Sequence, residues 1–220
     1  MLRRDGLADI PTGSEKRNRI AVSLRKQLQP SNERGFTALP FEPKYTFKVV
    51  FIGDAGVGKT SLVARHISTS FKENYMPTLG ANVTSKDYKV KGQTLTLMIW
   101  DIAAQEGFNA VRADYYNGAR AAFAVYDVTR PGTYDDILFW LDDLKKSLHK
   151  KIPIVLIANK IDLPAAVDSK TAEKLAHDLG LDFIRTSAKT GENVEESFRR
   201  IVEKLLKAIP ARTAMKREGK

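Results

Sequence analysis

The stretch from Gly53 to Thr60, which reads Gly-Asp-Ala-Gly-Val-Gly-Lys-Thr, places the strongest constraint on what this chain can fold into. It follows a run of strand-forming residues, 46–52, and precedes a helix-like run, 61–67. A strand, a glycine-rich turn and a helix start are the setting that a GxxxxGK[ST] phosphate-binding loop requires. The glycines let backbone amides close around a phosphate at the helix N-terminus. The sequence therefore predicts a nucleoside triphosphate site, without indicating which base it takes.

Two side chains complete the predicted phosphate loop. Lys59 is expected to reach the β- and γ-phosphates, and the Thr60 hydroxyl is expected to bind Mg²⁺. The alternative is an ordinary glycine-rich surface turn. The strand before the loop and the helix after it disfavour that alternative.

The composition limits the class of protein. A chain of 220 residues with 43% hydrophobic content can form one well-buried α/β domain with appendages. No apolar run approaches the roughly 18 residues that span a bilayer, and the N-terminus lacks the apolar core of a secretory signal. Without cysteine there is no disulfide, prenyl or palmitoyl attachment, and Leu2 stands where myristoylation needs glycine. We therefore expect a cytoplasmic protein.

Basic arms flank the expected domain at 45–209. Residues 1–44 carry nine Lys and Arg against five Asp and Glu, and the tail 210–220 carries four against one. Residues 1–44 are otherwise largely irregular, except that apolar residues recur every fourth position within 15–29. That segment could form a basic amphipathic helix with weak affinity for an anionic membrane, or it could be a partly ordered tail.

From residue 46 onward, strand-like and helix-like segments alternate, which predicts parallel βαβ units. We expect six strands, five of them parallel and one antiparallel at the edge, where 82–90 and 93–101 form a hairpin. The other strands are expected at 46–52, 121–126, 152–158 and 182–186. Five helices, at about 59–69, 109–118, 131–149, 168–179 and 192–208, are expected to cover both faces of the sheet. The predicted class is thus an α/β P-loop fold.

Three polar stretches, 100–106, 158–162 and 186–189, follow predicted strands, at the end where open α/β sheets bind ligands. A carboxylate can accept from both N–H groups on the Watson–Crick edge of guanine, which adenine cannot offer. Asp162 is placed for that contact, and Lys160 is placed to pack its stem along the purine plane. Together with a phosphate loop about a hundred residues upstream, this stretch predicts guanine.

These motifs make the chain from about 46 to 209 resemble a Ras-superfamily small GTPase, most similar to the Rab branch. Besides the phosphate loop, the resemblance rests on 75–80 (Tyr-Met-Pro-Thr-Leu-Gly), 100–101 (Trp-Asp), 115–119 (Tyr-Tyr-Asn-Gly-Ala), 125–129 (Val-Tyr-Asp-Val-Thr) and 186–194 (Thr-Ser-Ala-Lys-Thr-Gly-Glu-Asn-Val). The family is a GTP/GDP switch that hydrolyses GTP slowly. The resemblance therefore implies such a switch here, with a role in membrane trafficking or signalling.

The resemblance also implies roles for individual residues. The phosphates would be wrapped by Asp54, Ala55, Gly56, Val57, Gly58, Lys59, Thr60 and Ser61. The base would be held by Phe71, Asn159, Lys160, Asp162, Ser187, Ala188 and Lys189, although Phe71 could instead be an ordinary core aromatic. Mg²⁺ would be held by Thr60, by Thr78 in the GTP state, and through water by Asp101. Gln105 would orient the attacking water, and Lys59 would stabilise the transferring phosphoryl group.

Two departures from the family pattern bear on function. Ala104 replaces the glycine whose amide contacts the γ-phosphate, which either hampers the second switch or is a harmless exchange. The alternative function is accordingly a GTP-binding scaffold with impaired hydrolysis. The tail also lacks the cysteine that carries the family's lipid anchor.

The resemblance further implies protein partners for a monomeric switch. Effectors, exchange factors and GTPase-activating proteins would bind through 71–80 and 103–117. A nucleic-acid partner is suggested only by the basic arms, and no reading motif accompanies them. We expect a cytoplasmic protein, with any contact to a membrane surface peripheral, weak, made through the basic arms and without a lipid anchor.

Overall fold

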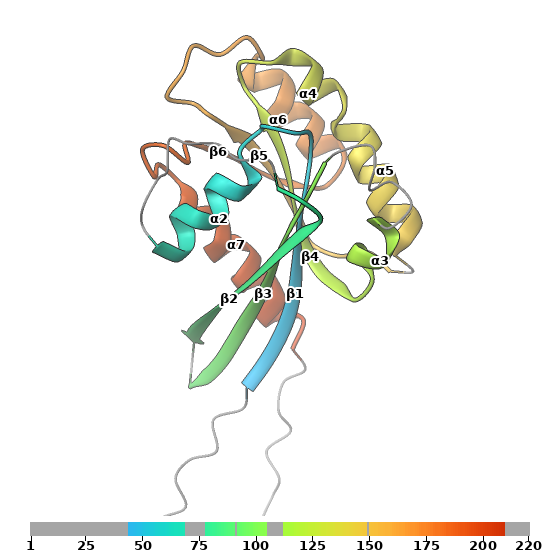
Figure 1. Cartoon of the computed structure of the whole chain (residues 1–220), viewed down its shortest axis with the longest axis vertical. Helices are drawn as coiled ribbons and strands as arrows, with labels where there is room; N and C mark the ends of the chain where they lie inside the picture. Colours follow the sequence, from blue (N-terminus) through green and yellow to red (C-terminus); the bar gives the residue numbers. More distant parts are fainter. Residues whose placement is uncertain (1–43, 69–77, 91, 105–111, 149, 210–220) are drawn as a thin grey trace, which may run out of the picture. The chain divides into compact units, whose positions relative to one another are not determined.

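The computed structural model describes residues 44–68, 78–90, 92–104, 112–148 and 150–209, and these form one mixed sheet with helices on both faces (Figure 1). The strands are β1 (Lys44–Ile52), β2 (Ala81–Val90), β3 (Gln93–Ile102), β4 (Ala119–Asp127), β5 (Ile154–Asn159) and β6 (Asp182–Thr186). Their order is β2-β3-β1-β4-β5-β6. Only the β2–β3 hairpin is antiparallel in this described sheet, as predicted.

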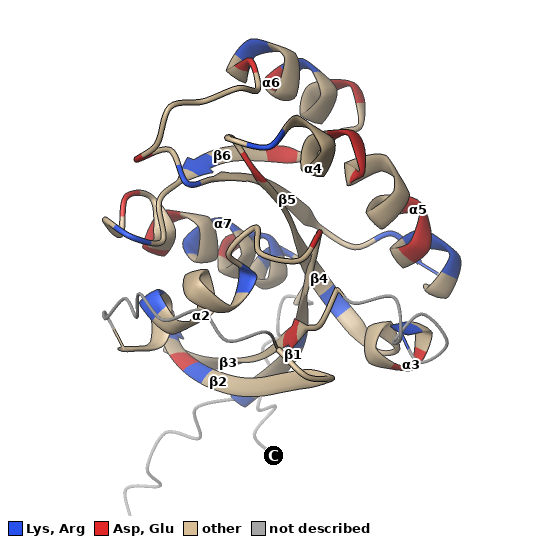
Figure 2. Ribbon diagram, turned by 45° about the horizontal axis from the view of Figure 1, so that its top comes forward, with Lys and Arg blue, Asp and Glu red and all other residues tan. Residues whose placement is uncertain are grey.

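The helices are α2 (Lys59–Ser68), α3 (Arg112–Tyr116), α4 (Pro131–Asp135), α5 (Ile137–Ser147), α6 (Ser169–Asp178) and α7 (Val194–Lys207). Helices α2 and α7 pack on one face of the sheet, and the other four cover the opposite face (Figure 2). The prediction of a P-loop α/β fold with helices on both faces is confirmed.

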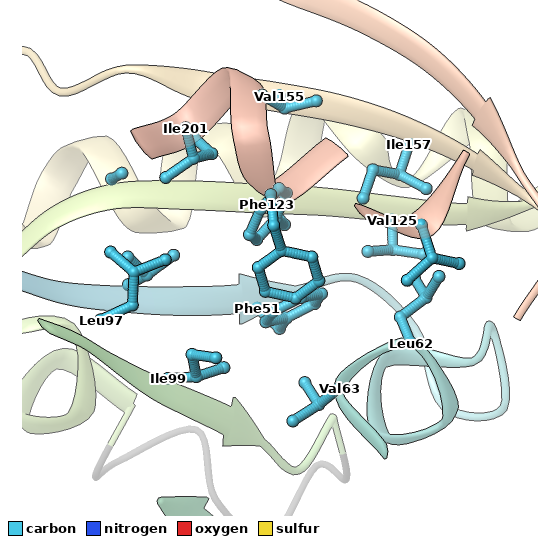
Figure 3. Close-up of a cluster of buried hydrophobic side chains, with 14 of the residues drawn as sticks. Phe51, Leu62, Val63, Leu97, Ile99, Phe123, Val125, Val155, Ile157 and Ile201 are labelled. Atoms are coloured by element: carbon cyan, nitrogen blue, oxygen red, sulfur yellow. The ribbon is translucent and has the colours of Figure 1, made fainter. Parts of the chain in front are cut away.

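Alternating side chains of the central strands build two cores. In β1, Val49 and Phe51 belong to the core under α2 and α7, while Val50 and Ile52 belong to the other core. The ring of Phe51 lies 4.6 Å from that of Phe123, centroid to centroid, and the two rings are tilted by 32° in the middle of the first cluster (Figure 3). Residues 49–52 of β1 and 121–126 of β4 are buried between the two layers of helices, and both stretches are apolar throughout, as central parallel strands require.

The helix predicted at 131–149 is divided in the structure. Pro131 lies in the first turn of α4, as expected of a residue with a fixed φ and no N–H. The break falls at Asp136, whose ψ of −5° departs from the helical value near −42°. Both pieces lie along the same face of the sheet.

The start of α6 shows a conventional cap. The Asp168 carboxylate accepts a 2.8 Å hydrogen bond from the amide of Thr171, which satisfies one of the free N–H groups of the first turn.

Among the helices within the described ranges, none is both long and apolar enough to cross a bilayer. Of the basic arms, residues 1–43 and 210–220 lie outside the described residues, while Lys44 is the first residue of β1.

Candidate functional site

The predicted phosphate loop lies between β1 and α2, and its glycines are required by close backbone approaches. Gly53 has φ +129°, and a Cβ there would lie 2.1 Å from the carbonyl oxygen of Val125 in β4. Gly58 has φ +100°, and a Cβ there would lie 2.3 Å from Nδ2 of Asn159. No other residue fits these two positions. The loop can therefore lie flat against the ends of β4 and β5 and turn directly into α2.

Lys59, the first residue of α2, is buried in the loop. Its Nζ donates to the carbonyl oxygens of Gly53 at 2.6 Å and Asp54 at 2.8 Å. Burial lowers the pKa of Lys59 to about 8, although the carboxylates of Asp101 and Asp54 oppose that shift. The ammonium group is thus held inside the loop. A phosphate bound there would favour the charged form of Lys59, which burial disfavours.

A small cavity of about 30 Å³ lies in front of the loop. Its walls come from the phosphate loop and α2, from Thr78 before β2, and from the end of β3. The lining residues are Ala55, Gly56, Gly58, Lys59, Thr60, Ser61, Thr78, Ile102, Ala103 and Ala104. The structure therefore brings six of the eight predicted phosphate-binding residues and Ala104 around one cavity, whereas Asp54 and Val57 do not line it.

Three oxygen-bearing side chains converge beside this cavity. Oγ1 of Thr60 donates to Oδ2 of Asp101 at 2.5 Å and lies 2.8 Å from Oγ1 of Thr78. Burial raises the pKa of Asp101, and Oδ1 of this residue is buried with no partner among the described residues. An unpaired buried carboxylate oxygen beside two hydroxyls suits a hard cation, because Mg²⁺ takes oxygen ligands. The residues present fit the predicted magnesium site.

This candidate site would hold a metal with few protein ligands. Within the described ranges there is no group of three or more His, Cys, Asp or Glu that could hold a metal. With Thr60, Thr78 and Asp101 as its candidate protein ligands, a cation here would take the rest of its coordination from phosphate and water, which is the usual arrangement for Mg²⁺ bound with a nucleotide.

Asn159, at the end of β5, joins the base-binding turn to the phosphate loop. Its Nδ2 donates to the Val57 carbonyl oxygen at 2.8 Å, and its Oδ1 accepts from the Thr186 hydroxyl at 3.1 Å and the Ala188 amide at 3.2 Å. The side chain is fully buried, so all these bonds are shielded from water. Three predicted nucleotide-binding segments are consequently fixed by one amide group.

Asp162 and the loop after β6 form the rest of the predicted base pocket. The Ser187 hydroxyl donates to Oδ1 of Asp162 at 2.6 Å and accepts from the Thr190 amide at 3.0 Å. Asp162 and Lys189 are exposed, and Ala188 is buried. Ser187 thus orients one carboxylate oxygen of Asp162, and the carboxylate remains accessible to a ligand because Asp162 is exposed.

Two of the predicted site residues cannot be placed. Phe71 and Gln105 lie outside the described residues, so their roles stay predictions.

The backbone of Ala104 is described by the structure. The non-glycine residues with positive φ within the described ranges are Lys160 and Asn193. Ala104 therefore pays no left-handed backbone strain in this conformation.

Several residues that support the site were not predicted from the sequence. Nε of Arg65 in α2 donates to the Ala188 carbonyl oxygen at 2.9 Å. Nε1 of Trp140 in α5 donates to Oδ1 of Asp54 at 2.6 Å. Asp127, at the end of β4, lies in the 125–129 motif and directly follows the apolar run 121–126, which is the signal that could have marked it.

The fold and these loops define a nucleotide-binding P-loop protein, and two comparisons identify the family. The Ras family model matches residues 48–207. The chain is also 40% identical over 170 residues to the Ras-related protein RABA2a of Arabidopsis thaliana, covering 76% of this chain and 78% of the relative. The chain belongs to the Ras family of small GTPases and is Rab-like.

Family membership decides between the two functions predicted from the sequence. The chain binds guanine nucleotide and hydrolyses GTP as a molecular switch, with regulators and effectors as protein partners. The alternative of a scaffold with impaired hydrolysis is not favoured. The sequence prediction of a small GTPase is confirmed.

Proposed function

We propose that this chain is a Rab-type switch of membrane traffic that holds GTP or GDP together with Mg²⁺. The observation that carries the proposal is the position of Thr78, whose Oγ1 lies 2.8 Å from that of Thr60 and 3.4 Å from Oδ2 of Asp101. Thr78 precedes β2 and belongs to the predicted first switch. A residue of a switch segment that reaches the metal position can respond to the γ-phosphate.

The residues of the chain divide the work of hydrolysis. Lys59 and the amides of the phosphate loop hold the β- and γ-phosphates and stabilise the charge that develops in the transition state. Gln105 orients the attacking water. Mg²⁺, when bound by Thr60, Thr78 and Asp101, supplies further neutralisation of the phosphate charge.

The partner surfaces follow from the switch. Effectors, exchange factors and GTPase-activating proteins bind through 71–80 and 103–117, and an activating partner supplies a transition-state arginine. The chain acts as a cytoplasmic monomer that reaches membranes peripherally, through its basic arms or through a partner.

Amide hydrogen exchange tests the switch directly. With Mg²⁺ present, residues 78–81 are expected to exchange more slowly with a non-hydrolysable GTP analogue than with GDP. In Thr78→Ala this difference should disappear, while Thr84→Ala in β2 should retain it. Equal exchange in the two nucleotide states of the natural chain would remove the basis of the proposal.

The trafficking role needs a cellular measurement. Fluorescently tagged Gln105→Leu, which should stay GTP-bound, is expected to collect on discrete membranes. Thr60→Asn, with a weakened metal site, is expected to remain diffuse. Identical distributions of the two variants would argue against a nucleotide-dependent role on membranes.

A further inference from the structure

A single buried carboxylate at the end of β4 holds two cations. Oδ2 of Asp127 accepts from Nε of Arg130 at 3.0 Å and from Nζ of Lys160 at 2.6 Å. Oδ1 accepts from the amide of Thr129 at 3.0 Å and from its hydroxyl at 2.7 Å. Burial alone would raise the pKa of Asp127, but the hydrogen bonds from Lys160, Thr129 and Arg130 hold it below its usual value. The carboxylate of Asp127 is therefore charged, and both of its oxygens accept hydrogen bonds.

The first cation belongs to the base pocket. Lys160 is the residue whose stem is predicted to pack along the guanine ring, and its backbone has φ +69°, which is uncommon for a residue with a Cβ. The carbonyl oxygen of Lys160 accepts from the Leu163 amide at 3.0 Å, which closes the turn that carries Asp162. With its Nζ bound to Asp127, the whole lysine side chain is fixed at both ends.

The second cation belongs to the phosphate loop. While Nε of Arg130 is bound to Asp127, its Nη2 donates to the Ala55 carbonyl oxygen at 3.0 Å. A Cβ on Gly56 would lie 3.6 Å from the same nitrogen. The guanidinium group therefore lies directly against the first half of the loop.

We propose that Asp127 is a positioning residue that couples the guanine-binding lysine to the phosphate loop through Arg130. The inference rests on the guanine-nucleotide binding described above. Without the carboxylate, two neighbouring cations would repel each other, so Lys160 and Arg130 would both leave their present positions. One charge would then disturb the base-binding and phosphate-binding parts of the site together.

The bridge requires an arginine at position 130. A guanidinium group offers several donors in a fixed fork, so one side chain can bind Asp127 and Ala55 at the same time. A lysine offers one nitrogen on a flexible stem. Arg130→Lys should therefore retain a cation for Asp127 and lose the contact with Ala55.

A double-mutant cycle on GDP release tests the coupling. We expect Asp127→Asn to release GDP at least about tenfold faster, because two charge-assisted hydrogen bonds lose their charged acceptor. Arg130→Ala should have a smaller effect. The double variant should release GDP about as fast as Asp127→Asn alone, because contacts in one network are not additive. Multiplicative effects, or an Asp127→Asn rate equal to that of the natural chain, would overturn the proposal.

Amide hydrogen exchange separates positioning from loss of the fold. In GDP-loaded Asp127→Asn, Ala55 and Gly56 should exchange faster although Asp127 contacts neither, while α6 keeps its protection. Asp168→Asn, which removes an exposed carboxylate that caps α6, is the matched control and should leave the phosphate loop unchanged. A uniform rise across the sheet in Asp127→Asn would mean a structural role only and would overturn the proposal.

Arg130→Lys keeps the proposal testable if Asp127→Asn does not fold, because the Arg130 side chain is 46% exposed and its loss should be tolerated. We expect faster exchange at 54–57 and unchanged exchange at 159–163. Unchanged exchange at 54–57 would overturn the coupling. The natural chain is measured in the same assay, and its failure to retain GDP would contradict nucleotide binding itself, which separates the two outcomes.

Discussion

Asn159 donates a 2.8 Å hydrogen bond to the carbonyl oxygen of Val57, so a side chain of the base-binding turn also holds the phosphate loop in place. The same amide accepts from Thr186 and Ala188. The loops that bind the base and the phosphates are therefore parts of one buried hydrogen-bond network. Nucleotide binding should depend on this network as a whole.

Asn159→Ala leaves the Val57 carbonyl and the Ala188 amide without their partner in a buried place. We expect a loss of about 2–3 kcal/mol in the free energy of unfolding, and GDP release at least about tenfold faster. Urea unfolding and release of a fluorescent GDP analogue measure the two effects. Asn82→Ala, which removes an exposed amide from β2, is the control and should change neither. Natural release rates in Asn159→Ala would show that the network is not needed.

Removing Mg²⁺ should have a smaller effect on the rate of GDP release in Asp101→Asn than in the natural chain. In the natural chain, a chelator should accelerate GDP release, because Mg²⁺ links Thr60 and Asp101 to the phosphates. Asp101→Asn should release GDP quickly even with Mg²⁺, and the chelator should add little. Asp87→Asn in β2 is the control, because the Asp87 carboxylate accepts a hydrogen bond from Thr96 and has no part in the metal site. This variant should show the full chelator effect. An undiminished chelator effect in Asp101→Asn would contradict the assigned metal site.

His66 should make the fold sensitive to acid. Its ring is buried in α2 between Glu195, Tyr88 and Phe198, and burial lowers its pKa to about 4 despite the Glu195 carboxylate. Between about pH 6.5, the ordinary value, and pH 4, the unfolded chain binds a proton that the folded chain does not. The contribution of neutral His66 to the free energy of unfolding is therefore complete above pH 6.5 and is lost as the pH falls towards 4.

The comparison of His66→Gln with the natural chain isolates this effect. Between pH 6.5 and pH 4, the natural chain should lose up to about 3 kcal/mol more stability than the variant, since one pKa unit corresponds to 1.36 kcal/mol. Urea unfolding of the GDP-loaded proteins at both pH values measures it. His177→Gln, which changes an exposed histidine, should follow the natural chain. Parallel pH profiles for His66→Gln and the natural chain would refute the assignment.

Ala104→Gly should leave GTP turnover within about twofold of the natural rate, because Ala104 does not occupy the left-handed region that favours glycine. The glycine should also cost about 0.4–1 kcal/mol of stability, because it gives the unfolded chain more freedom. Single-turnover hydrolysis and urea unfolding give both numbers. A turnover tenfold faster than natural would instead show that Ala104 hampers the second switch.

Much of this molecule could be predicted because its signals are local. The Gly53–Thr60 loop, the alternating hairpin residues and the apolar central strands each lie within one short stretch of sequence. Their order along the chain fixes the end of the sheet at which the loops meet. The position of the nucleotide site could accordingly be predicted from motifs, while the roles given to Phe71 and Gln105 stay predictions.

The supporting contacts could not be predicted because they join residues far apart in the sequence. Trp140 meets Asp54 only because α5 packs beside the phosphate loop, and Arg130 reaches Ala55 only because β4 neighbours β1. The break at Asp136 depends on a backbone angle that no composition signal specifies. Such features follow from packing, which the pattern of a single segment does not contain.

Single-turnover hydrolysis of GTP by the natural chain with Mg²⁺ tests the central claim most directly. Bound nucleotide is separated by chromatography at successive times. The account predicts tight binding and slow conversion to GDP, at roughly 10⁻⁴ per second without a partner. Retention of GTP without conversion, or no retention of guanine nucleotide at all, would contradict it.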